Sequence, residues 1–334
     1  MSSKPELSIV IPAYNERKVL PLCYAKVTEV LEGLGKSYEI IFVDDGSNDG
    51  SADYLAGLAQ QNNPVRVVYL SRNFGKEAAL TAGIDYAAGD AVIILDADLQ
   101  DPPELIPDML KTREQEAVDV VLMRRRTRAG ETATKRLTAY WYYRLLNKVS
   151  DFDIPEDTGD FRLMSRKAVD ALKQLPERNR YMKGLFSWIG MDTAVMEYDR
   201  DPRVAGEVQS NYPVLFRLAV QGITSFSVAP LRLAVIMGLV VAGFGTVFGL
   251  WIIFKALLFG DPVQGYPSTM AVITFLGGTQ LFTIGILGEY VGKTYIESKQ
   301  RPNYLVKKVL GSEDTVTPSI ITEQPGSRLN KTNT

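Results

Sequence analysis

The sequence predicts an α/β domain with a doubly wound, mostly parallel sheet, followed by an amphipathic interface helix and two transmembrane helices. Between residues 7 and 123, short apolar runs rich in β-branched residues alternate with longer amphipathic stretches, as in strands joined by crossover helices. Further along, residues 233–254 and 262–288 carry no charged side chain. Each of these two stretches is as long as the roughly 20 residues that a helix needs to cross a bilayer.

Five strands are expected, at residues 7–11, 38–43, 65–70, 91–95 and 118–123, with helices in the gaps between them. Each strand is a nearly continuous apolar run, which indicates burial on both faces of a parallel sheet. Ligands of such sheets bind beyond the carboxyl ends of the strands. The residues that follow each strand are therefore the first candidates for a functional site.

The second half of the chain is expected to meet a membrane. Residues 211–231 show apolar side chains at helical spacing beside Arg217 and Gln221, which predicts an amphipathic helix at the membrane surface. A helix that packs against the domain core is the alternative for this segment. Transmembrane helices are expected at 232–258 and 266–292, and the alternative for these two is a buried helical hairpin of a large soluble protein.

Charge predicts the orientation of the two spans. The connection between them carries only Asp261, whereas basic residues stand on the outer sides of both spans, namely Arg217, Arg232, Lys293, Lys299, Arg301, Lys307 and Lys308. The positive-inside rule therefore places both ends of the chain in the cytoplasm, at the plasma (inner) membrane. Residues 1–210 are the expected cytoplasmic catalytic domain, without a signal peptide before it. Residues 293–334 are the expected cytoplasmic tail, disordered from about residue 311.

Composition excludes several classes of function. Lys and Arg number 37 against 39 Asp and Glu, so bulk charge does not favour nucleic-acid binding. The chain has no histidine and a single cysteine, Cys23. Zinc sites, disulfide frameworks and catalysis that depends on histidine are thereby excluded. A metal ion would have to be held by oxygen ligands.

The strongest local motif is LDADLQDPPE at residues 95–104, in which an apolar strand runs directly into two aspartates. The period of two along an extended chain points Asp96 and Asp98 in the same direction. Two carboxylates so placed can share Mg²⁺ or Mn²⁺ and leave coordination positions for a diphosphate, and Gln100 could assist. Acidic residues that cap the next helix, as Asp101 could do before the two prolines, are the alternative.

Two other strands end in polar motifs, IPAYNE at residues 11–16 and VDDGSNDG at residues 43–50, so three strand ends converge on one crevice. The second motif fails as an EF-hand, because Ala56 occupies the twelfth position, where a bidentate acid is needed. A P-loop fails because Leu70 replaces its first glycine and Glu77 its hydroxyl residue. The glycine fingerprint of dinucleotide-binding folds is also missing after the first strand.

In combination with RNFGK at residues 72–76 and DTGDFRL at residues 157–163, these motifs resemble the metal-dependent family 2 glycosyltransferases of GT-A fold. Within that family the chain is similar to the polyprenyl-phosphate glycosyltransferases related to dolichol-phosphate mannose synthase, of the bacterial GtrB type. The resemblance covers residues 6–310. It departs from the family pattern at residues 206–212, and it implies two C-terminal membrane helices and a homotetramer.

The resemblance implies a role for each matching position. Asp96, Asp98 and Gln100 would surround Mg²⁺ or Mn²⁺, and Lys76 would approach the diphosphate, although an ordinary surface lysine is the alternative. The nucleotide-sugar site would consist of Pro12, Tyr14, Glu16, Asp44, Asp45, Ser47, Lys76 and Asp96. The implied reaction is a direct displacement with inversion at the sugar carbon.

The acceptor site is expected in a basic segment between residues 123 and 148. A polyprenyl phosphate would be held there by Arg124, Arg126, Arg128 and Lys135. A solvated helix face or an anchor to lipid headgroups is the alternative. Because the acceptor phosphate is largely ionised at neutral pH, a general base is optional. Asp157 is the preferred catalytic carboxylate, as base or orienter, and a turn-forming role is its alternative.

The expected function is transfer of a hexose, with UDP-glucose as the first choice of donor, to undecaprenyl or another polyprenyl phosphate. GDP-mannose, UDP-N-acetylglucosamine and UDP-4-deoxy-4-formamido-arabinose remain alternatives, because the sugar pocket cannot be recognised from sequence. A processive polysaccharide synthase needs more spans and a Gln-x-x-Arg-Trp motif, neither of which the sequence has. A non-catalytic membrane adaptor is opposed by the intact Lys76, Asp96, Asp98 and Gln100.

Overall fold

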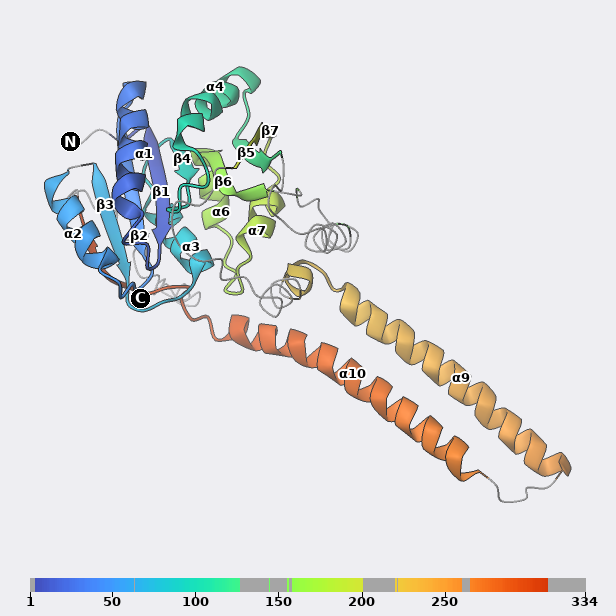
Figure 1. Cartoon of the computed structure of the whole chain (residues 1–334). Helices are drawn as coiled ribbons and strands as arrows, with labels where there is room; N and C mark the ends of the chain where they lie inside the picture. The colour runs from blue at the N-terminus through green and yellow to red at the C-terminus, as the bar shows by residue number, and fades with distance from the viewer. Residues whose placement is uncertain are drawn as a thin grey trace, which may run out of the picture.

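The computed structural model describes residues 4–62, 64–126, 144, 155, 158–200, 220, 222–259 and 265–311. These form an α/β domain around one eight-stranded sheet and a helical hairpin that projects from it (Figure 1). The strand order is β7-β5-β6-β4-β1-β2-β3-β8. The predicted fold class, a mostly parallel α/β sheet followed by two long apolar helices, is confirmed.

All five expected strands are present. They are β1 Leu7–Ala13, β2 Tyr38–Asp44, β3 Val65–Leu70, β4 Ala91–Ile94 and β5 Val120–Arg125. The pairs β1–β2, β1–β4 and β2–β3 are parallel. The fifth strand does not join β4 directly, because β6 (Thr158–Ser165) lies antiparallel between them. The carboxyl ends of β4 and β5 still reach the same edge, and β6 begins there.

Sequence reasoning missed β6, β7 (Thr193–Tyr198) and β8 (Val306–Leu310). The last of these corrects the expected tail at 293–334, since β8 pairs antiparallel with β3 and completes the sheet of the catalytic domain. Its two lysines, Lys307 and Lys308, interrupt the apolar pattern, so the segment resembles a polar tail in sequence. Residues 312–334 lie outside the described part of the chain.

Helices cover both faces of the sheet. One face packs against α1 (Leu20–Leu34), α2 (Ser51–Gln61) and α4 (Ile106–Glu116), which follows the short 3₁₀ turn η1 (Pro103–Leu105). The other face packs against α3 (Lys76–Tyr86), α6 (Arg166–Lys173) and α7 (Met182–Trp188). Both clusters are fully apolar at their centres, which is the continuous burial that the strand sequences predicted.

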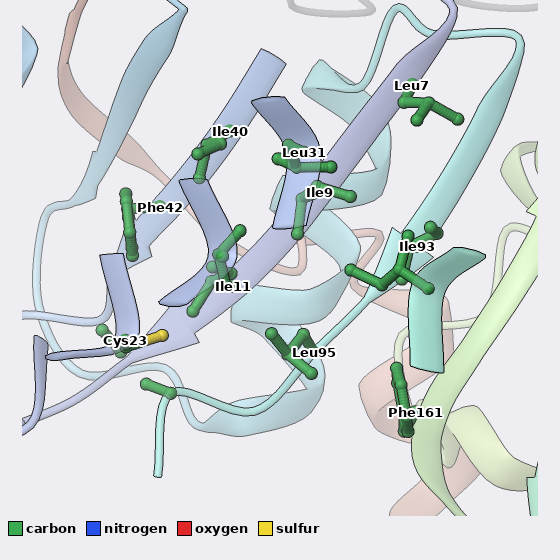
Figure 2. Close-up of a cluster of buried hydrophobic side chains, with 14 of the residues drawn as sticks. Leu7, Ile9, Ile11, Cys23, Leu31, Ile40, Phe42, Ile93, Leu95 and Phe161 are labelled. Carbon is green, nitrogen blue, oxygen red and sulfur yellow. The ribbon is translucent and has the colours of Figure 1, made fainter. Parts of the chain in front are cut away.

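The alternation of β1 explains how one strand serves both layers. Ile9 and Ile11 face the α1 side, where Figure 2 shows them beside Phe42 and Leu31, and Val10 faces the α3 side. Helix α3 lies close to the sheet at Gly83, where an added Cβ would come within 2.2 Å of Val10 Cγ1. This close approach packs the second half of α3 directly against β1.

The hairpin consists of α9 (Ala229–Phe259) and α10 (Tyr266–Ser298). Segments 229–252 and 272–298 are long and apolar enough to cross a membrane, with mean hydropathies of 2.3 and 1.3. Only 6% and 0% of their apolar windows are buried, whereas a core hairpin of a soluble protein would be mostly buried. Of the expected interface helix at 211–231, residues 211–219 and 221 lie outside the described part of the chain. Residues 222–226 are helical, and 229–231 already belong to α9.

Candidate active site at the carboxyl edge of the sheet

The loops after β1 and β2 are joined by reciprocal hydrogen bonds. The Asn15 N–H donates to Ser47 Oγ at 3.0 Å, and the Asn48 N–H donates to Asn15 Oδ1 at 2.9 Å. Asn15 adopts a left-handed φ of 56°, which asparagine tolerates better than most residues. Ser47, expected at the nucleotide-sugar, thus also ties the two loops together. Tyr14 stands beside this link with 41% of its surface exposed.

The two aspartates at the end of β2 lie in different surroundings. Burial raises the pKa of both carboxyl groups. Asp45 accepts hydrogen bonds from the N–H groups of Phe74 and Gly75, at 2.7 and 2.9 Å. Asp44 Oδ1 is buried without a hydrogen-bond partner among the described residues. Asp45 therefore fixes the turn before α3, and Asp44 keeps an acceptor for a ligand.

That turn delivers Lys76 to the centre of the site. Lys76 is the first residue of α3, and its ammonium lies 2.7 Å from Asp96 Oδ1 and 2.6 Å from Asp160 Oδ2. The two carboxylates raise the pKa of Lys76, and the ammonium holds the pKa of Asp160 below its usual range despite burial. Lys76 thus pairs with both carboxylates, although its side chain is 47% exposed.

The aspartate motif does not cap the helix that follows it. The N-caps of η1 and α4 are Pro102 and Leu105, and neither makes a side-chain capping bond. Asp98 is 7% exposed, and its Oδ1 accepts the Gln100 N–H at 3.1 Å. Asp101 is fully buried and accepts a hydrogen bond from the Tyr198 hydroxyl, so its role also differs from capping.

The donor set fits a hard divalent ion held partly by its substrate. Asp96, Asp98 and the Gln100 amide offer only oxygen donors, which Mg²⁺ and Mn²⁺ prefer over nitrogen or sulfur. Within the described ranges, groups of three or more acidic or cysteine side chains positioned to hold a metal do not occur. The protein would therefore provide few ligands and leave positions for phosphate and water.

The basic residues at the end of β5 pair with acidic residues at the end of β7 and just after it. Arg124 Nη2 lies 2.5 Å from Glu197 Oε1, and Arg126 Nη1 lies 3.1 Å from Asp199 Oδ2, both pairs being exposed. Arg125 points to the opposite side of the strand, where it hydrogen-bonds Tyr198. Arg128, Lys135 and Asp157 lie outside the described residues.

Three functional candidates were missed by sequence reasoning. Arg125 could have been found from the alternation of β5, which separates it from its two basic neighbours. Asp160 lies in the same DTGDFRL segment as Asp157, the preferred carboxylate, and the start of β6 carries it to Lys76. Glu77 follows Lys76, and burial together with the charge of Asp160 raises its pKa to about 7. Its carboxylate accepts the Met182 N–H at 2.9 Å.

Comparison with known proteins defines the class to which this geometry belongs. Residues 8–173 match the model of Glycosyl transferase family 2, and residues 229–294 match that of the GtrB C-terminal hairpin. The chain belongs to glycosyl transferase family 2, with the hairpin of its GtrB branch, and is a glycosyltransferase. The resemblance inferred from the motifs is thereby confirmed.

Particular relatives cover nearly the whole chain. The prophage bactoprenol glucosyl transferase homolog of Escherichia coli (strain K12) is 46% identical over 304 residues, covering 91% of this chain and 99% of the relative. The bactoprenol glucosyl transferase of Shigella phage SfV is 48% identical over 302 residues, covering 90% and 98%. The structure of Mycobacterium tuberculosis glucosyl-3-phosphoglycerate synthase with Mn²⁺, UDP and glucosyl-3-phosphoglycerate has a TM-score of 0.47 at 21% identity, covering 66% of this chain and 78% of that one.

Proposed function

We propose that this protein transfers glucose from UDP-glucose to a polyprenyl phosphate, such as undecaprenyl phosphate, at the cytoplasmic face of the membrane. Relatives named bactoprenol glucosyl transferase, at 46% and 48% identity over nearly the full chain, support this acceptor and this sugar. The observation that carries the proposal is the Lys76 ammonium between Asp96 and Asp160 at the edge where the strands end. This arrangement suits a departing diphosphate beside a metal site.

The nucleotide would occupy the crevice formed by the first two strand ends. Tyr14 offers an exposed ring on which a base can stack, and Asp44 offers the unpartnered carboxylate oxygen for an N–H or hydroxyl of the nucleoside. Pro12, near the end of β1, and Glu16, on the loop that follows it, are both half-buried and would complete the wall. Asp45 would contribute by holding the turn before Lys76, since both of its oxygens already accept backbone N–H groups.

Asp96, Asp98 and Gln100 would hold Mg²⁺ or Mn²⁺, which when bound would neutralise part of the charge on the diphosphate. Lys76 would move from Asp96 toward the diphosphate and stabilise the negative charge that develops on it. Asp160 would keep its contact with the ammonium during this movement, because it is the second carboxylate paired with Lys76. Lys76 is therefore the group that we assign to leaving-group stabilisation.

The reaction is a single displacement. An oxygen of the acceptor phosphate forms a bond to the anomeric carbon while the bond from that carbon to the diphosphate oxygen breaks. The electron pair leaves with the nucleoside diphosphate, and the configuration of the sugar carbon inverts. The phosphate is already ionised, so Asp157 would orient the acceptor or take up a proton without being indispensable.

We place the acceptor phosphate at the basic edge that begins with Arg124 and Arg126, followed by Arg128 and Lys135. Arg124 and Arg126 now pair with Glu197 and Asp199. Exposed ion pairs of this kind contribute only about 0–1 kcal/mol, so a doubly charged phosphate can displace the carboxylates. The lipid chain would then extend toward the helical hairpin.

The hairpin would anchor the enzyme in the membrane with two spans, at about 232–258 and 266–292. The catalytic domain at 1–210, the interface helix at 211–231 and both chain ends would lie on the cytoplasmic side, because basic residues flank the hairpin there. The exposed apolar faces of α9 and α10 also suit packing against other copies in a homotetramer.

A donor screen tests this function. The purified protein in nanodiscs that contain undecaprenyl phosphate and Mg²⁺ or Mn²⁺ is incubated with labelled UDP-glucose, GDP-mannose, UDP-N-acetylglucosamine or UDP-4-deoxy-4-formamido-arabinose. We expect labelled lipid from UDP-glucose alone, and none when the polyprenyl phosphate is omitted. Transfer from another donor would correct the sugar, and no labelled lipid from any donor would contradict the function.

A further inference from the structure

The end of α10 is attached to the catalytic domain through a short segment, residues 176–182, which we call the strap. Glu297, in the last turn of α10, accepts the Arg178 N–H at 2.9 Å and the Asn179 N–H at 2.8 Å on its Oε1. A carboxylate in this turn is opposed by the negative end of the helix dipole. The two backbone N–H groups of the strap donate to this carboxylate and so offset the unfavourable interaction with the helix dipole.

Further contacts hold the strap to the chain that leaves α10. The Arg178 guanidinium donates to the carbonyl oxygens of Arg301 and Gln300, at 3.2 and 3.4 Å. The Asn303 amide donates to the carbonyl oxygen of Glu177 at 3.3 Å. The first half of the strap is therefore fixed by the end of the membrane hairpin.

The other end of the strap is fixed to α3, the helix that carries Lys76. The Met182 N–H donates to Glu77 Oε2 at 2.9 Å, and the Arg180 guanidinium donates to Thr81 Oγ1 at 3.3 Å. At the far end of α3, the Tyr304 hydroxyl donates to Asp85 Oδ2 at 2.7 Å. Helix α3 is thus linked at both ends to segments that the end of α10 holds.

A cavity of about 240 Å³ lies between the strap, the start of α3 and Asn303. It is lined by Phe74, Gly75, Lys76, Glu77, Ala78, Arg178, Asn179, Arg180 and Asn303. The middle of the strap borders this cavity, so hydrogen bonds contribute much of what holds it in place. They include those of the Arg178 and Asn179 N–H groups to Glu297 and that of the Asn179 amide to Ser225 Oγ, while the Met182 N–H bonds Glu77 at the end of the strap.

We propose that Glu297 is a positioning residue for sugar transfer: from the end of α10 it holds the strap, and through Glu77 the strap holds the start of α3 and Lys76. The proposal rests on the proposed function, since it assigns Lys76 to the leaving diphosphate. The reaction centre is thereby tied to the membrane hairpin, whose end sets the position of the ammonium relative to Asp96 and Asp160.

Three variants of the full-length protein in nanodiscs test this proposal. Glu297→Ala removes the acceptor, Glu297→Gln keeps one carbonyl oxygen for both N–H groups, and Lys299→Ala removes an exposed charge at the end of the same helix, beyond the proposed span. We expect Glu297→Ala to lower kcat at least tenfold with less than a threefold change in the KM for the nucleotide-sugar. Glu297→Gln should recover kcat to within about threefold of the wild type, and Lys299→Ala should match the wild type.

Hydrogen–deuterium exchange of the same proteins gives a readout independent of activity. In Glu297→Ala, a peptide covering 176–182 should exchange at least tenfold faster, while peptides from β1 to β4 keep their protection. Unchanged exchange of the strap in Glu297→Ala would overturn the proposal, as would a kcat equal to that of the wild type. A wild-type protein without transferase activity would instead contradict the proposed function, and the exchange result would still decide whether Glu297 holds the strap.

Discussion

The Lys76 ammonium lies 2.6 Å from Asp160 Oδ2, although Lys76 is the first residue of α3 and Asp160 the third residue of β6. Asp160 is partly shielded, with a side chain 12% exposed, and the ammonium keeps its carboxyl group ionised by lowering its pKa. Because the ammonium divides its contacts between Asp160 and Asp96, a metal ion and Lys76 can both contact the Asp96 carboxylate. This balance between the ammonium and the two carboxylates is what binding of a diphosphate would depend on.

Replacement of Asp160 by asparagine should disturb that balance. In Asp160→Asn the ammonium loses one carboxylate and pairs more strongly with Asp96, a proposed metal ligand. We expect transfer to fall about tenfold or more and the Mg²⁺ concentration for half-maximal activity to rise. The matched control is Asp170→Asn, whose exposed carboxylate lies on α6 away from Lys76. Equal metal requirements in the two variants would exclude competition between Lys76 and the metal.

The two sides of β5 should respond differently to loss of an arginine. Arg125→Ala removes a hydrogen bond to Tyr198 and a positive charge near the buried Asp101, which should cost about 1–3 kcal/mol and lower the Tm by several degrees. Arg124→Ala removes only an exposed pair and should leave the Tm nearly unchanged while raising the KM for polyprenyl phosphate. Thermal unfolding in detergent measures the Tm of both variants, and transfer assays at varied polyprenyl phosphate give the KM. Equal losses of Tm would contradict the assignment of Arg125 to the buried side and Arg124 to the exposed side of β5.

Glu77 should make stability depend on pH. Its pKa is about 7 in the folded protein and 4.5 as an ordinary glutamate, so between these values the unfolded chain loses a proton that the folded protein keeps. The free energy of unfolding therefore falls as pH rises through this window, by about 3 kcal/mol for this group. Comparison of Tm from pH 5 to 7.5 should show a smaller decline in Glu77→Gln than in the wild type. Parallel curves of Tm against pH for the two proteins would mean that Glu77 stays ionised over this whole pH range.

The proposed topology can be tested with Cys23 left in place. This cysteine is fully buried, and burial with the nearby charges of Asp98 and Glu16 raises its pKa to about 12, so it should not react with maleimides. In intact cells, an impermeant maleimide should label Asp261→Cys but not Lys299→Cys. Permeabilised cells should show labelling of both. Labelling of Lys299→Cys in intact cells would reverse the orientation.

The strands that sequence analysis recognised are mostly apolar on both faces, apart from the buried pair of Glu39 on β2 and Arg66 on β3, because burial largely determines them. The same reasoning missed β6, since Asp160 and Arg162 interrupt its apolar pattern. It missed β8 because a strand at the edge of a sheet tolerates two lysines. Whether a strand can carry charged side chains depends on its place in the sheet, which the sequence alone does not give.

Within the site, the structure brings Lys76 to Asp96, the metal-binding role of Asp96 and Asp98 stays a prediction, and the motifs could not assign hydrogen bonds. Asp45 looked like a ligand-binding residue, and it holds the turn before α3. Glu297 belongs to no motif, because its two partners in the strap are backbone groups more than a hundred residues away. Backbone partners leave no signature in side-chain spacing.

The most direct test of the central claim is the rate of glucosyl transfer by Lys76→Met. Labelled UDP-glucose, undecaprenyl phosphate and Mg²⁺ are supplied to the wild type, to Lys76→Met and to Lys18→Met, which replaces an exposed lysine after β1. We expect Lys76→Met to lower kcat by about a hundredfold or more, as for loss of one electrostatic contact in a transition state. Lys18→Met should equal the wild type. A Lys76→Met enzyme that transfers glucose at the wild-type rate would contradict the role of Lys76 in stabilising the leaving diphosphate.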